Sequence, residues 1–249
     1  MNIDINCDLG EGADLHSCDR DAQIMPFISR CNIACGGHAG TPEIMGRSIE
    51  NALKNSLKIG AHPSYPDREN FGRKSLVIPQ NKLLDSLCTQ VNQLENIARS
   101  LGATLDHIKL HGALYNDTES NRELAKSIIT LLDKEYPSLK IIGLANAAMQ
   151  FAAAKQNKTF IREGFMDRQY LSNNQLAPRS MAGAVIAETE QCLEQAICLA
   201  KGLEFNDYHG EKLQFSVDTI CLHGDNPQAP IIARQLNQHL NANGVSIAR

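Results

Sequence analysis

The sequence predicts one α/β domain over residues 1–249, a (β/α) barrel with about seven parallel strands. Short apolar runs typical of buried parallel strands alternate with longer amphipathic segments along the whole chain. The chain has 249 residues, which is close to the length of a typical barrel of this kind. No linker, low-complexity tract or block of like charge divides it, so we expect a single domain.

The expected strands are short and apolar, and they cover residues 3–7, 32–35, 58–61, 107–110, 140–144, 159–162 and 216–222. Helices are expected between them, over residues 19–29, 42–55, 79–101, 121–136, 147–155, 188–202 and 229–243. Thr41 followed by Pro42 is typical of a helix start, and Gly102 is typical of a helix end. The polar residues 172–179 are expected to form a long loop.

Composition excludes several classes of protein. The net charge of −4 is too small and too scattered to predict binding to nucleic acid or to a membrane surface. No apolar run approaches the roughly 18 residues that a membrane-spanning helix needs. The first residues lack the basic and apolar regions of a signal peptide, so we expect a cytoplasmic protein in which the eight cysteines are structural thiols. Cys31 and Cys35 are separated by three residues, whereas zinc and redox motifs have two.

The stretch Ile59–Arg73, IGAHPSYPDRENFGR, carries the densest set of functional groups in the chain. It begins as a strand and breaks at Pro63, which cannot donate to a sheet and keeps the residue before it extended. Ionisable and polar side chains follow within a dozen positions. A solvated surface loop is the alternative interpretation, but a strand that ends in such a loop is how α/β enzymes build active sites.

The same arrangement recurs along the chain, because polar side chains follow six of the expected strands. They are Asp8 and Glu11; His38; His62 and Asp67; Lys109 and His111; Asp167 and Arg168; and His223 and Asp225. A barrel would bring all of them to one face, whereas a doubly wound sheet would spread them along a crevice where fewer could meet. Four histidines at strand ends are hard to ascribe to chance, so we expect an enzyme.

The motifs that carry these residues resemble the LamB/YcsF family, the A subunits of 5-oxoprolinase. They are NCDLGEG (6–12), NIACGGHAG (32–40), IGAHPSYPDRENFGR (59–73), HIKLHGALYN (107–116), GFMDRQY (164–170), APRS (177–180) and TICLHGD (219–225). The resemblance implies a distorted seven-stranded barrel related to glycoside hydrolases and metal-dependent polysaccharide deacetylases. It also implies ATP-dependent opening of 5-oxo-L-proline to L-glutamate in a complex with two partner subunits, B and C. Gly37 stands where the family usually has a bulky aromatic residue, which could enlarge the pocket.

Neither the nucleotide nor a metal follows from the residues alone. The phosphate-binding pattern G-x-x-x-x-G-K-[ST] is absent, so ATP is expected from the resemblance only, and it could bind largely to a partner. A divalent metal is the alternative role for part of the cluster, with Asp8, His38 and His62 as its ligands, as the resemblance to metal-dependent hydrolases implies.

The chemistry of lactam opening assigns hypothetical roles to the strand-end residues. Asp8 or Glu11 is a candidate general base, and His223 or His62 a candidate general acid. Lys109, Arg168 and Arg179 are candidates to hold the substrate carboxylate or phosphoryl oxygens. The remaining candidates for substrate binding are His38, Asp67, Arg68, His111, Asp167 and Asp225.

Two other functions are also compatible with the sequence. One is a metal-dependent deacetylase-like hydrolase that acts alone, which would turn over N-acetylated sugars without ATP or partners. The other is a non-catalytic subunit that binds a small acid and delivers it, which would keep its function when His62 or His223 is replaced.

Overall fold

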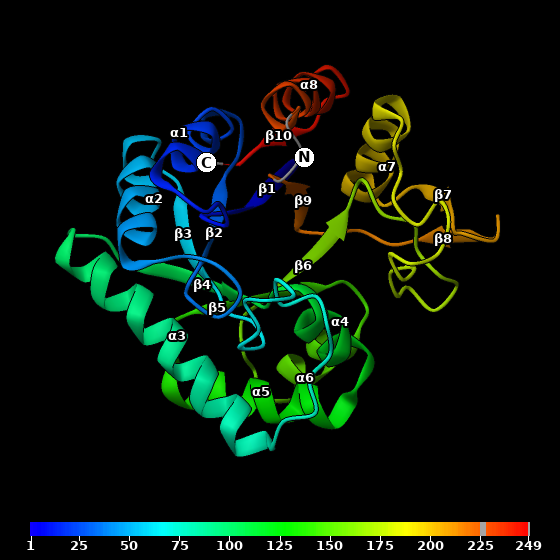
Figure 1. Ribbon diagram of the computed structural model, residues 1–249. Coiled ribbons are helices and arrows are strands. Elements are labelled where there is room, and N and C mark those ends of the chain that lie inside the picture. The colour runs from blue at the N-terminus through cyan, green and yellow to red at the C-terminus, as the bar shows by residue number, and fades with distance from the viewer. Residues whose placement is uncertain (225–227, 249) are drawn as a thin grey trace.

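A closed ring of parallel strands forms the centre of the computed structural model, which describes residues 1–224 and 228–248 (Figure 1). Within these residues the ring has the order β1-β2-β3-β4-β5-β6-β9, and β9 pairs with β1 to close it. The strands are β1 (Asn2–Leu9), β2 (Arg30–Ala34), β3 (Lys58–His62), β4 (Leu105–Lys109), β5 (Lys140–Leu144), β6 (Phe160–Phe165) and β9 (Thr219–His223). The predicted seven-stranded barrel is therefore confirmed.

Helices form a layer around the outside of the strands (Figure 1). They are α1 (Leu15–Asp21), α2 (Pro42–Lys54), α3 (Gln80–Ser100), α4 (Gly112–Ser120), α5 (Arg122–Glu135), α6 (Ala148–Lys155), α7 (Thr189–Lys201) and α8 (Ala229–Ala242). Thr41 caps α2 as predicted, since its side chain accepts a hydrogen bond from the backbone N–H of Ile44 and Pro42 occupies the first turn. Asn121 caps α5 in the same way.

Several elements differ from the prediction. The helix expected over residues 19–29 is wrong, because α1 begins after Asp14, whose carboxylate accepts a hydrogen bond from the backbone N–H of Ser17. A separate 3-10 helix, Met25–Phe27, follows it, with Pro26 in its first turn. Helix α4 was not predicted. The hairpin of β7 (Glu204–Asn206) and β8 (Lys212–Gln214) and the short strand β10 (Ser246–Ile247) were not predicted.

Helix α4 is tied to the barrel by a buried carboxylate that no sequence pattern singled out. Glu119 Oε1 accepts a hydrogen bond from the backbone N–H of Leu144 at 2.8 Å, and Oε2 accepts one from Met149 at 3.1 Å. Burial raises the pKa of Glu119 to about 8. This contact fixes α4, and with it the residues at its start, against β5 and α6.

The inside of the barrel is polar rather than filled by aliphatic side chains. Asn32 Nδ2 donates to Asn6 Oδ1 at 2.8 Å and to Asp8 Oδ1 at 2.7 Å, and His107 Nε2 lies 2.7 Å from Asn32 Oδ1. His107 fits only because β3 carries Gly60 opposite it, where an added Cβ would lie 2.1 Å from the imidazole. At the amino-terminal end, Arg30 pairs with Asp4 at 2.6 Å and with Asp106 at 2.7 Å.

Two further expectations concern the chain as a whole. All eight cysteines are free thiols, and six of them are buried, as predicted. Among the described residues, no helix combines the length and the apolar character needed to cross a membrane.

Candidate active site

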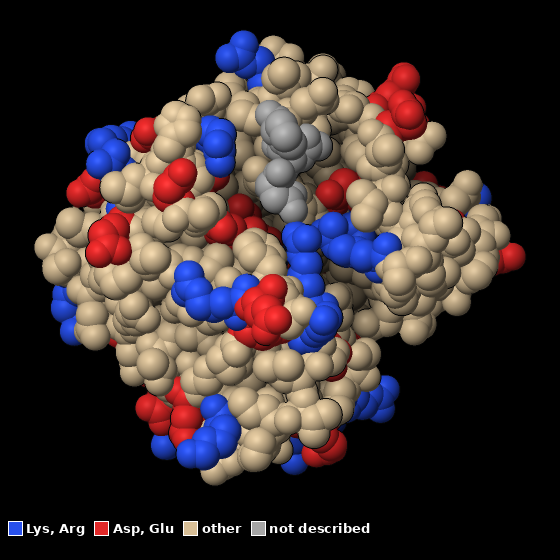
Figure 2. Space-filling model, viewed as in Figure 1, with Lys and Arg blue, Asp and Glu red and all other residues tan. Residues whose placement is uncertain are grey.

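The carboxyl ends of the barrel strands surround a cavity of about 420 Å³. This volume is within the range of small-ligand sites. Figure 2 shows Lys and Arg atoms gathered near the middle of one face of the molecule, beside Asp and Glu atoms. The site residues predicted from the sequence that line the cavity are Asp8, Glu11, His62, Lys109, His111, Arg168, Arg179 and His223. The predicted convergence of the strand ends is therefore found.

Three imidazole rings and one carboxylate form a cluster on one side of this cavity, which we call the imidazole cluster: Glu11, His38, His62 and His111. Glu11 Oε1 lies 3.0 Å from His38 Nε2 and 3.1 Å from His111 Nδ1. His111 Nδ1 also lies 3.0 Å from His62 Nε2. The rings of His38 and His111 stack at a centroid distance of 3.6 Å.

The backbone around the imidazole cluster explains why these rings meet. His62 ends β3 immediately before Pro63, and the backbone N–H of His111 donates to Pro63 O at 2.9 Å. Gly72 adopts a positive φ of 62°, and an added Cβ there would lie 3.0 Å from His38 Cβ and 3.1 Å from His111 Cδ2. A side chain at residue 72 would therefore push these two rings away.

Burial and charge shift the protonation of the imidazole cluster in opposite directions. Burial lowers the pKa of His38 to about 4, so this ring is neutral near pH 7. Burial alone would also lower the pKa of His62, but the charge of Asp8 outweighs it and the pKa is raised. Glu11 is held ionised, because its contacts with His111 and His38 outweigh burial and keep its pKa well below the usual range.

Asp8 and Lys109 form the floor of the cavity. Lys109 Nζ is buried and lies 3.0 Å from Asp8 Oδ1 and 2.7 Å from Glu163 Oε1. Glu163 Oε2 accepts a hydrogen bond from the hydroxyl of Tyr115 at 2.9 Å. Burial alone would raise the pKa of Asp8, but the charges of His62 and Lys109 outweigh it and hold the pKa well below its usual range. Asp8 is therefore an ionised carboxylate at neutral pH.

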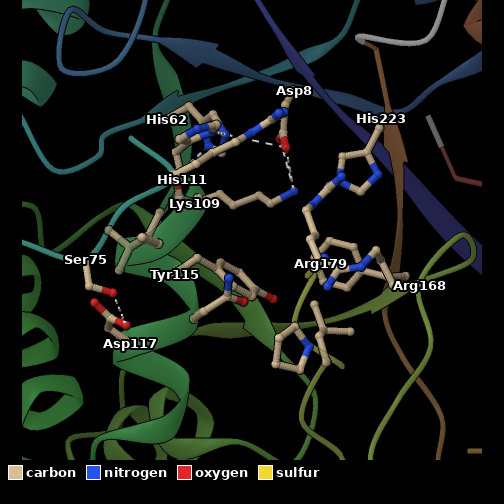
Figure 3. A pocket seen from close by; sticks show the side chains of 18 of the residues that line it. Asp8, His62, Ser75, Lys109, His111, Tyr115, Asp117, Arg168, Arg179 and His223 are labelled. Atoms are coloured by element: carbon tan, nitrogen blue, oxygen red, sulfur yellow. Dashed lines mark hydrogen bonds and ion pairs between the residues drawn. The ribbon is translucent and has the colours of Figure 1, made fainter. Parts of the chain in front are cut away.

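His223, Arg179 and Arg168 lie on the other side of Asp8 from His62 and His111 (Figure 3). Together with Asp167, which is bound to His223, they form a second ionic group. His223 Nδ1 lies 2.7 Å from Asp167 Oδ2, and Arg179 Nη2 lies 3.1 Å from His223 Nε2. Burial alone would lower the pKa of His223, but the carboxylate of Asp167 outweighs it and raises the pKa. A ring nitrogen of His223 and a carboxylate oxygen of Asp8 lie within 4.8 Å of each other.

The two arginines of this group lack an acidic partner in the part of the chain that the structure describes. Within residues 1–224 and 228–248, no carboxylate lies within ion-pair distance of Arg168 or Arg179. Arg168 is buried, its Nη2 donates to Ala177 O at 2.6 Å, and its Nε has no hydrogen-bond partner among the described residues. Burial and the neighbouring charge of Arg179 lower the pKa of Arg168 to about 10. Two guanidinium groups that are close together and unpaired favour the binding of an anion.

Not every predicted site residue lines the cavity. His38 lies behind Glu11 and His111, and Asp167 lies behind His223. Asp67 instead accepts hydrogen bonds from Asn70 within its own loop, and Arg68 donates to the carbonyl groups of Gly36 and Gly40. The two hydrogen bonds of Arg68 hold neighbouring loops together, so its side chain is not directed at a ligand. Asp225 lies outside the described residues.

Glu163 and Tyr115 are among the residues of the cavity region that were missed in the sequence, and one expectation about the cavity is not met. Glu163 was visible as a charged residue near a strand end, but nothing showed that it would face Lys109, and Tyr115 lies in a helix that was not predicted. An added Cβ at Gly37 would lie 2.3 Å from Gln90 Oε1 and 2.5 Å from Ser64 Oγ. The space beside Gly37 is thus filled by Gln90 and does not enlarge the cavity.

A second cavity of about 530 Å³ shares Asp8, Glu11 and Gly224 with the first. Ser17, Arg20 and Gln23 also line it, together with apolar side chains such as Ile24 and Phe71. The two carboxylates are therefore accessible from two sides.

Comparison with known proteins gives a consistent assignment. The model of the LamB/YcsF family matches residues 3–249. The A subunit of 5-oxoprolinase from Bacillus cereus (strain AH187) is 38% identical over 98% of this chain and 97% of its own length. The crystal structure of a lactam utilization protein from Thermus thermophilus covers 99% of both chains, with a TM-score of 0.90 and 31% identity. A family 4 carbohydrate esterase from Streptomyces lividans shares the fold alone, with a TM-score of 0.51 and 11% identity over all of this chain and 92% of that one.

Proposed function

Because the chain belongs to the LamB/YcsF family, we propose that it is the A subunit of a 5-oxoprolinase. In this proposal it takes part in the ATP-dependent hydrolytic opening of 5-oxo-L-proline to L-glutamate, with ADP and phosphate as the other products. The relatives are named as one lettered subunit of an enzyme, which supports a multi-subunit complex, and we take the partners to be the B and C subunits. The site described above supports the same reaction through the order of its charged groups.

One observation carries the proposal: the groups of the cavity follow the same order as the groups of the lactam. In 5-oxoproline the carboxylate is attached to the carbon next to the ring nitrogen, and the carbonyl lies on the other side of that nitrogen. In the cavity, Arg179 lies beside His223, and His223 lies beside Asp8. A substrate whose carboxylate binds Arg179 and Arg168 therefore has its ring nitrogen near His223 and its carbonyl near Asp8.

The unpaired arginines support the first part of this orientation. Arg168 and Arg179 form no ion pair among the described residues, so a substrate carboxylate would displace no carboxylate of the protein there. A guanidinium group can hold a carboxylate through two parallel hydrogen bonds. Contact of Arg179 with the substrate would also release His223 Nε2, to which it now donates at 3.1 Å.

The carboxylate near the carbonyl supports the involvement of ATP. Asp8 is a weak base, since the charges of His62 and Lys109 outweigh burial and keep its pKa low. A weak base can direct water to an activated carbonyl but not to an unactivated lactam, which is a stable amide. Transfer of the terminal phosphoryl group of ATP to the lactam oxygen would supply this activation.

Bond changes after activation follow from these positions. Water, positioned by Asp8, adds to the activated carbon, and the bond between that carbon and the ring nitrogen then breaks. His223 gives the nitrogen its proton, while Asp167 holds the imidazole in place. A second water releases phosphate from the resulting acyl phosphate, so the products are glutamate, ADP and phosphate.

The test is reconstitution with the B and C subunits, followed by measurement of glutamate formed from 5-oxoproline with and without ATP. Arg179→Ala should raise the KM for 5-oxoproline by roughly 10-fold or more, the effect of losing a charge-assisted hydrogen bond. Arg99→Ala is the matched control, because Arg99 lies on the exposed face of α3 and its ion pair is with Glu95 of the same helix.

Two results would overturn the proposal. The first is glutamate formation that is the same with or without this chain in the mixture. The second is turnover of N-acetylated sugars by the purified chain without ATP or partners, which would favour a deacetylase-like hydrolase instead.

A further inference from the structure

We propose that Glu11, His62 and His111 form a binding site for a divalent first-row transition-metal ion, with zinc as the representative ion. The three atoms that face one another are Glu11 Oε1, His62 Nε2 and His111 Nδ1. They are separated by 3.0 Å between the two nitrogens, 3.1 Å from Glu11 Oε1 to His111 Nδ1 and 3.7 Å from Glu11 Oε1 to His62 Nε2. This proposal does not depend on the activity proposed above, since it concerns binding of the ion alone.

Hydrogen bonds to the backbone determine which nitrogen of each ring carries the proton. His62 Nδ1 lies 2.9 Å from Lys109 O, and a carbonyl oxygen can only accept, so Nδ1 is protonated. His111 Nε2 lies 3.0 Å from Phe71 O and is protonated for the same reason. In the neutral rings, His62 Nε2 and His111 Nδ1 therefore both carry lone pairs.

These two lone pairs point at each other and at a carboxylate oxygen. Three acceptors within 3.7 Å of one another repel unless a proton or a metal ion lies between them, so a metal ion would bind here by displacing that proton. Within the described part of the chain, Glu11 has no Lys or Arg within ion-pair distance, and its partners are histidines. These residues thus supply the site with no permanent cation.

The spacing suits a metal ion. A circle through three atoms with these separations has a radius of about 1.9 Å, which is slightly less than the bond length of roughly 2.0–2.2 Å from zinc to imidazole nitrogen or carboxylate oxygen. A single ion can therefore reach all three atoms from a point slightly outside their plane. Two imidazoles with one carboxylate are a known set of protein ligands for a catalytic zinc ion, and they leave a further position open.

The donor types also decide the class of ion. Imidazole nitrogens with one carboxylate oxygen suit zinc and its first-row neighbours, whereas magnesium and calcium prefer sites made of oxygen atoms alone. A bound ion of this kind would act as a Lewis acid that polarises a carbonyl or phosphoryl oxygen in the cavity.

Groups around the three ligands hold them in place, as is usual for metal sites. The second nitrogen of each ligand ring is bound to a backbone carbonyl, as described above. His38 completes the support, because its Nε2 donates to Glu11 Oε1 at 3.0 Å and its ring stacks on His111. His38 Nδ1 is buried, with no partner among the described residues. Because its Nε2 proton is donated to Glu11, His38 orients Glu11 and does not bind the ion in our assignment, which differs from the set Asp8, His38 and His62 expected from the sequence.

The experiment uses the full chain, freed of metal by dialysis against a chelator, and titrates it with Co²⁺ and with Zn²⁺. Visible absorption of bound Co²⁺ reports its coordination, and calorimetry gives the stoichiometry and affinity for Zn²⁺. We expect one equivalent of either ion, and no binding of Mg²⁺ at the same concentrations. Glu11→Gln and His111→Asn should each weaken binding by roughly 100-fold or more. His62→Asn is a third variant with the same expectation, in case one of the others fails to fold as judged by circular dichroism.

Two controls separate this site from others. His16→Asn changes an exposed histidine and should leave binding unchanged. His223→Asn tests the neighbouring group of Asp8, Cys221 and His223, whose ligand atoms also lie within 4.8 Å of one another. Binding that survives Glu11→Gln and His111→Asn but is lost in His223→Asn would overturn the assignment. Absence of Co²⁺ absorption and of Zn²⁺ heat in the wild-type protein would overturn it as well, as would preferential binding of Mg²⁺.

Discussion

Replacing Asp167 by asparagine should lower the rate of glutamate formation by roughly 100-fold, because it removes the charge that holds and stabilises His223. The two side chains lie 2.7 Å apart and are mostly shielded from solvent. Opposite unit charges at a separation of ~4 Å attract each other by about 4 kcal/mol in a partly buried site and by about 1 kcal/mol in water. A 100-fold loss corresponds to about 2.7 kcal/mol, which lies between these limits.

The assay is glutamate release by the complex reconstituted with the B and C subunits, measured as a function of pH. Burial alone would lower the pKa of His223, and Asp167 is the group that raises it. The asparagine variant should therefore have a lower pKa at His223. If His223 must be protonated to act as the acid, activity falls as the pH rises through its pKa, so this limb of the profile should move to lower pH in the variant.

A double variant tests whether Asp167 acts through His223. If it does, Asp167→Asn combined with His223→Gln should be no slower than His223→Gln alone. Multiplied losses would mean that the two residues have separate roles. An Asp167→Asn protein with a normal Tm and more than half of the wild-type rate would refute the reasoning.

Three further predictions concern other parts of the molecule. His62→Ala should lower glutamate formation by ~100-fold. It should also destabilise the fold by roughly 1–3 kcal/mol, because loss of the buried ring leaves the carbonyl oxygen of Lys109 without its hydrogen-bond donor. A thermal melt would detect this as a lower Tm. Asp106→Asn should lower stability more at neutral pH than near pH 2. Contacts with His107, Lys140 and Arg30 outweigh burial and hold the pKa of Asp106 well below its usual range, so its contribution is complete above the unfolded pKa of about 3.9 and shrinks as the pH falls toward the folded value. Denaturant titrations of both proteins across pH 2–7 would show this, and a gap that widens at low pH would contradict it. The chain alone should hydrolyse ATP negligibly, since it lacks G-x-x-x-x-G-K-[ST], and a phosphate-release assay that finds robust turnover without partners would contradict this.

The fold could be predicted because its signals are local and repeated. Short apolar runs of four to seven residues alternate with amphipathic segments. Each strand of the ring has the next one along the chain as its neighbour, except where the β7–β8 hairpin intervenes between β6 and β9. The elements that were missed lack such signals. Strand β10 has two residues, and its pairing with Asn2 and Ile3 joins the two ends of the chain. Helix α4 begins at Gly112, whose φ of 59° lies outside the helical region, so the sequence HGALYN reads as a turn.

The candidate site could be predicted to the extent that parallel strands fix where their ends lie. Strand order placed Asp8, His62, Lys109 and His223 on one face, and the structure brings them to one cavity. The direction of each side chain within that face depends on contacts between residues far apart in the sequence. Arg68, for example, turns toward the carbonyls of Gly36 and Gly40, which no local pattern could indicate. The ion pair of Lys109 with Glu163 likewise joins two residues that are 54 positions apart in the sequence.

The polar interior of the barrel gives these site residues a rigid support. The carboxylate of Asp8 accepts a hydrogen bond from Asn32 at 2.7 Å and pairs with Lys109 at 3.0 Å. Asn32 is itself hydrogen-bonded to His107. An interior of aliphatic side chains would stabilise the barrel more, since buried ionic groups lose much of their Coulomb attraction to desolvation. It would leave Asp8 without directional contacts, however, and a carboxylate free to rotate could not hold water at one carbon of the substrate. Replacing Asn32 by leucine tests this support. Fold stability should fall, because Asn6, Asp8 and His107 each lose a buried hydrogen-bond partner, and kcat should fall as well, with little change in KM. A variant that loses stability while retaining kcat would show that the interior network serves the barrel and not the site.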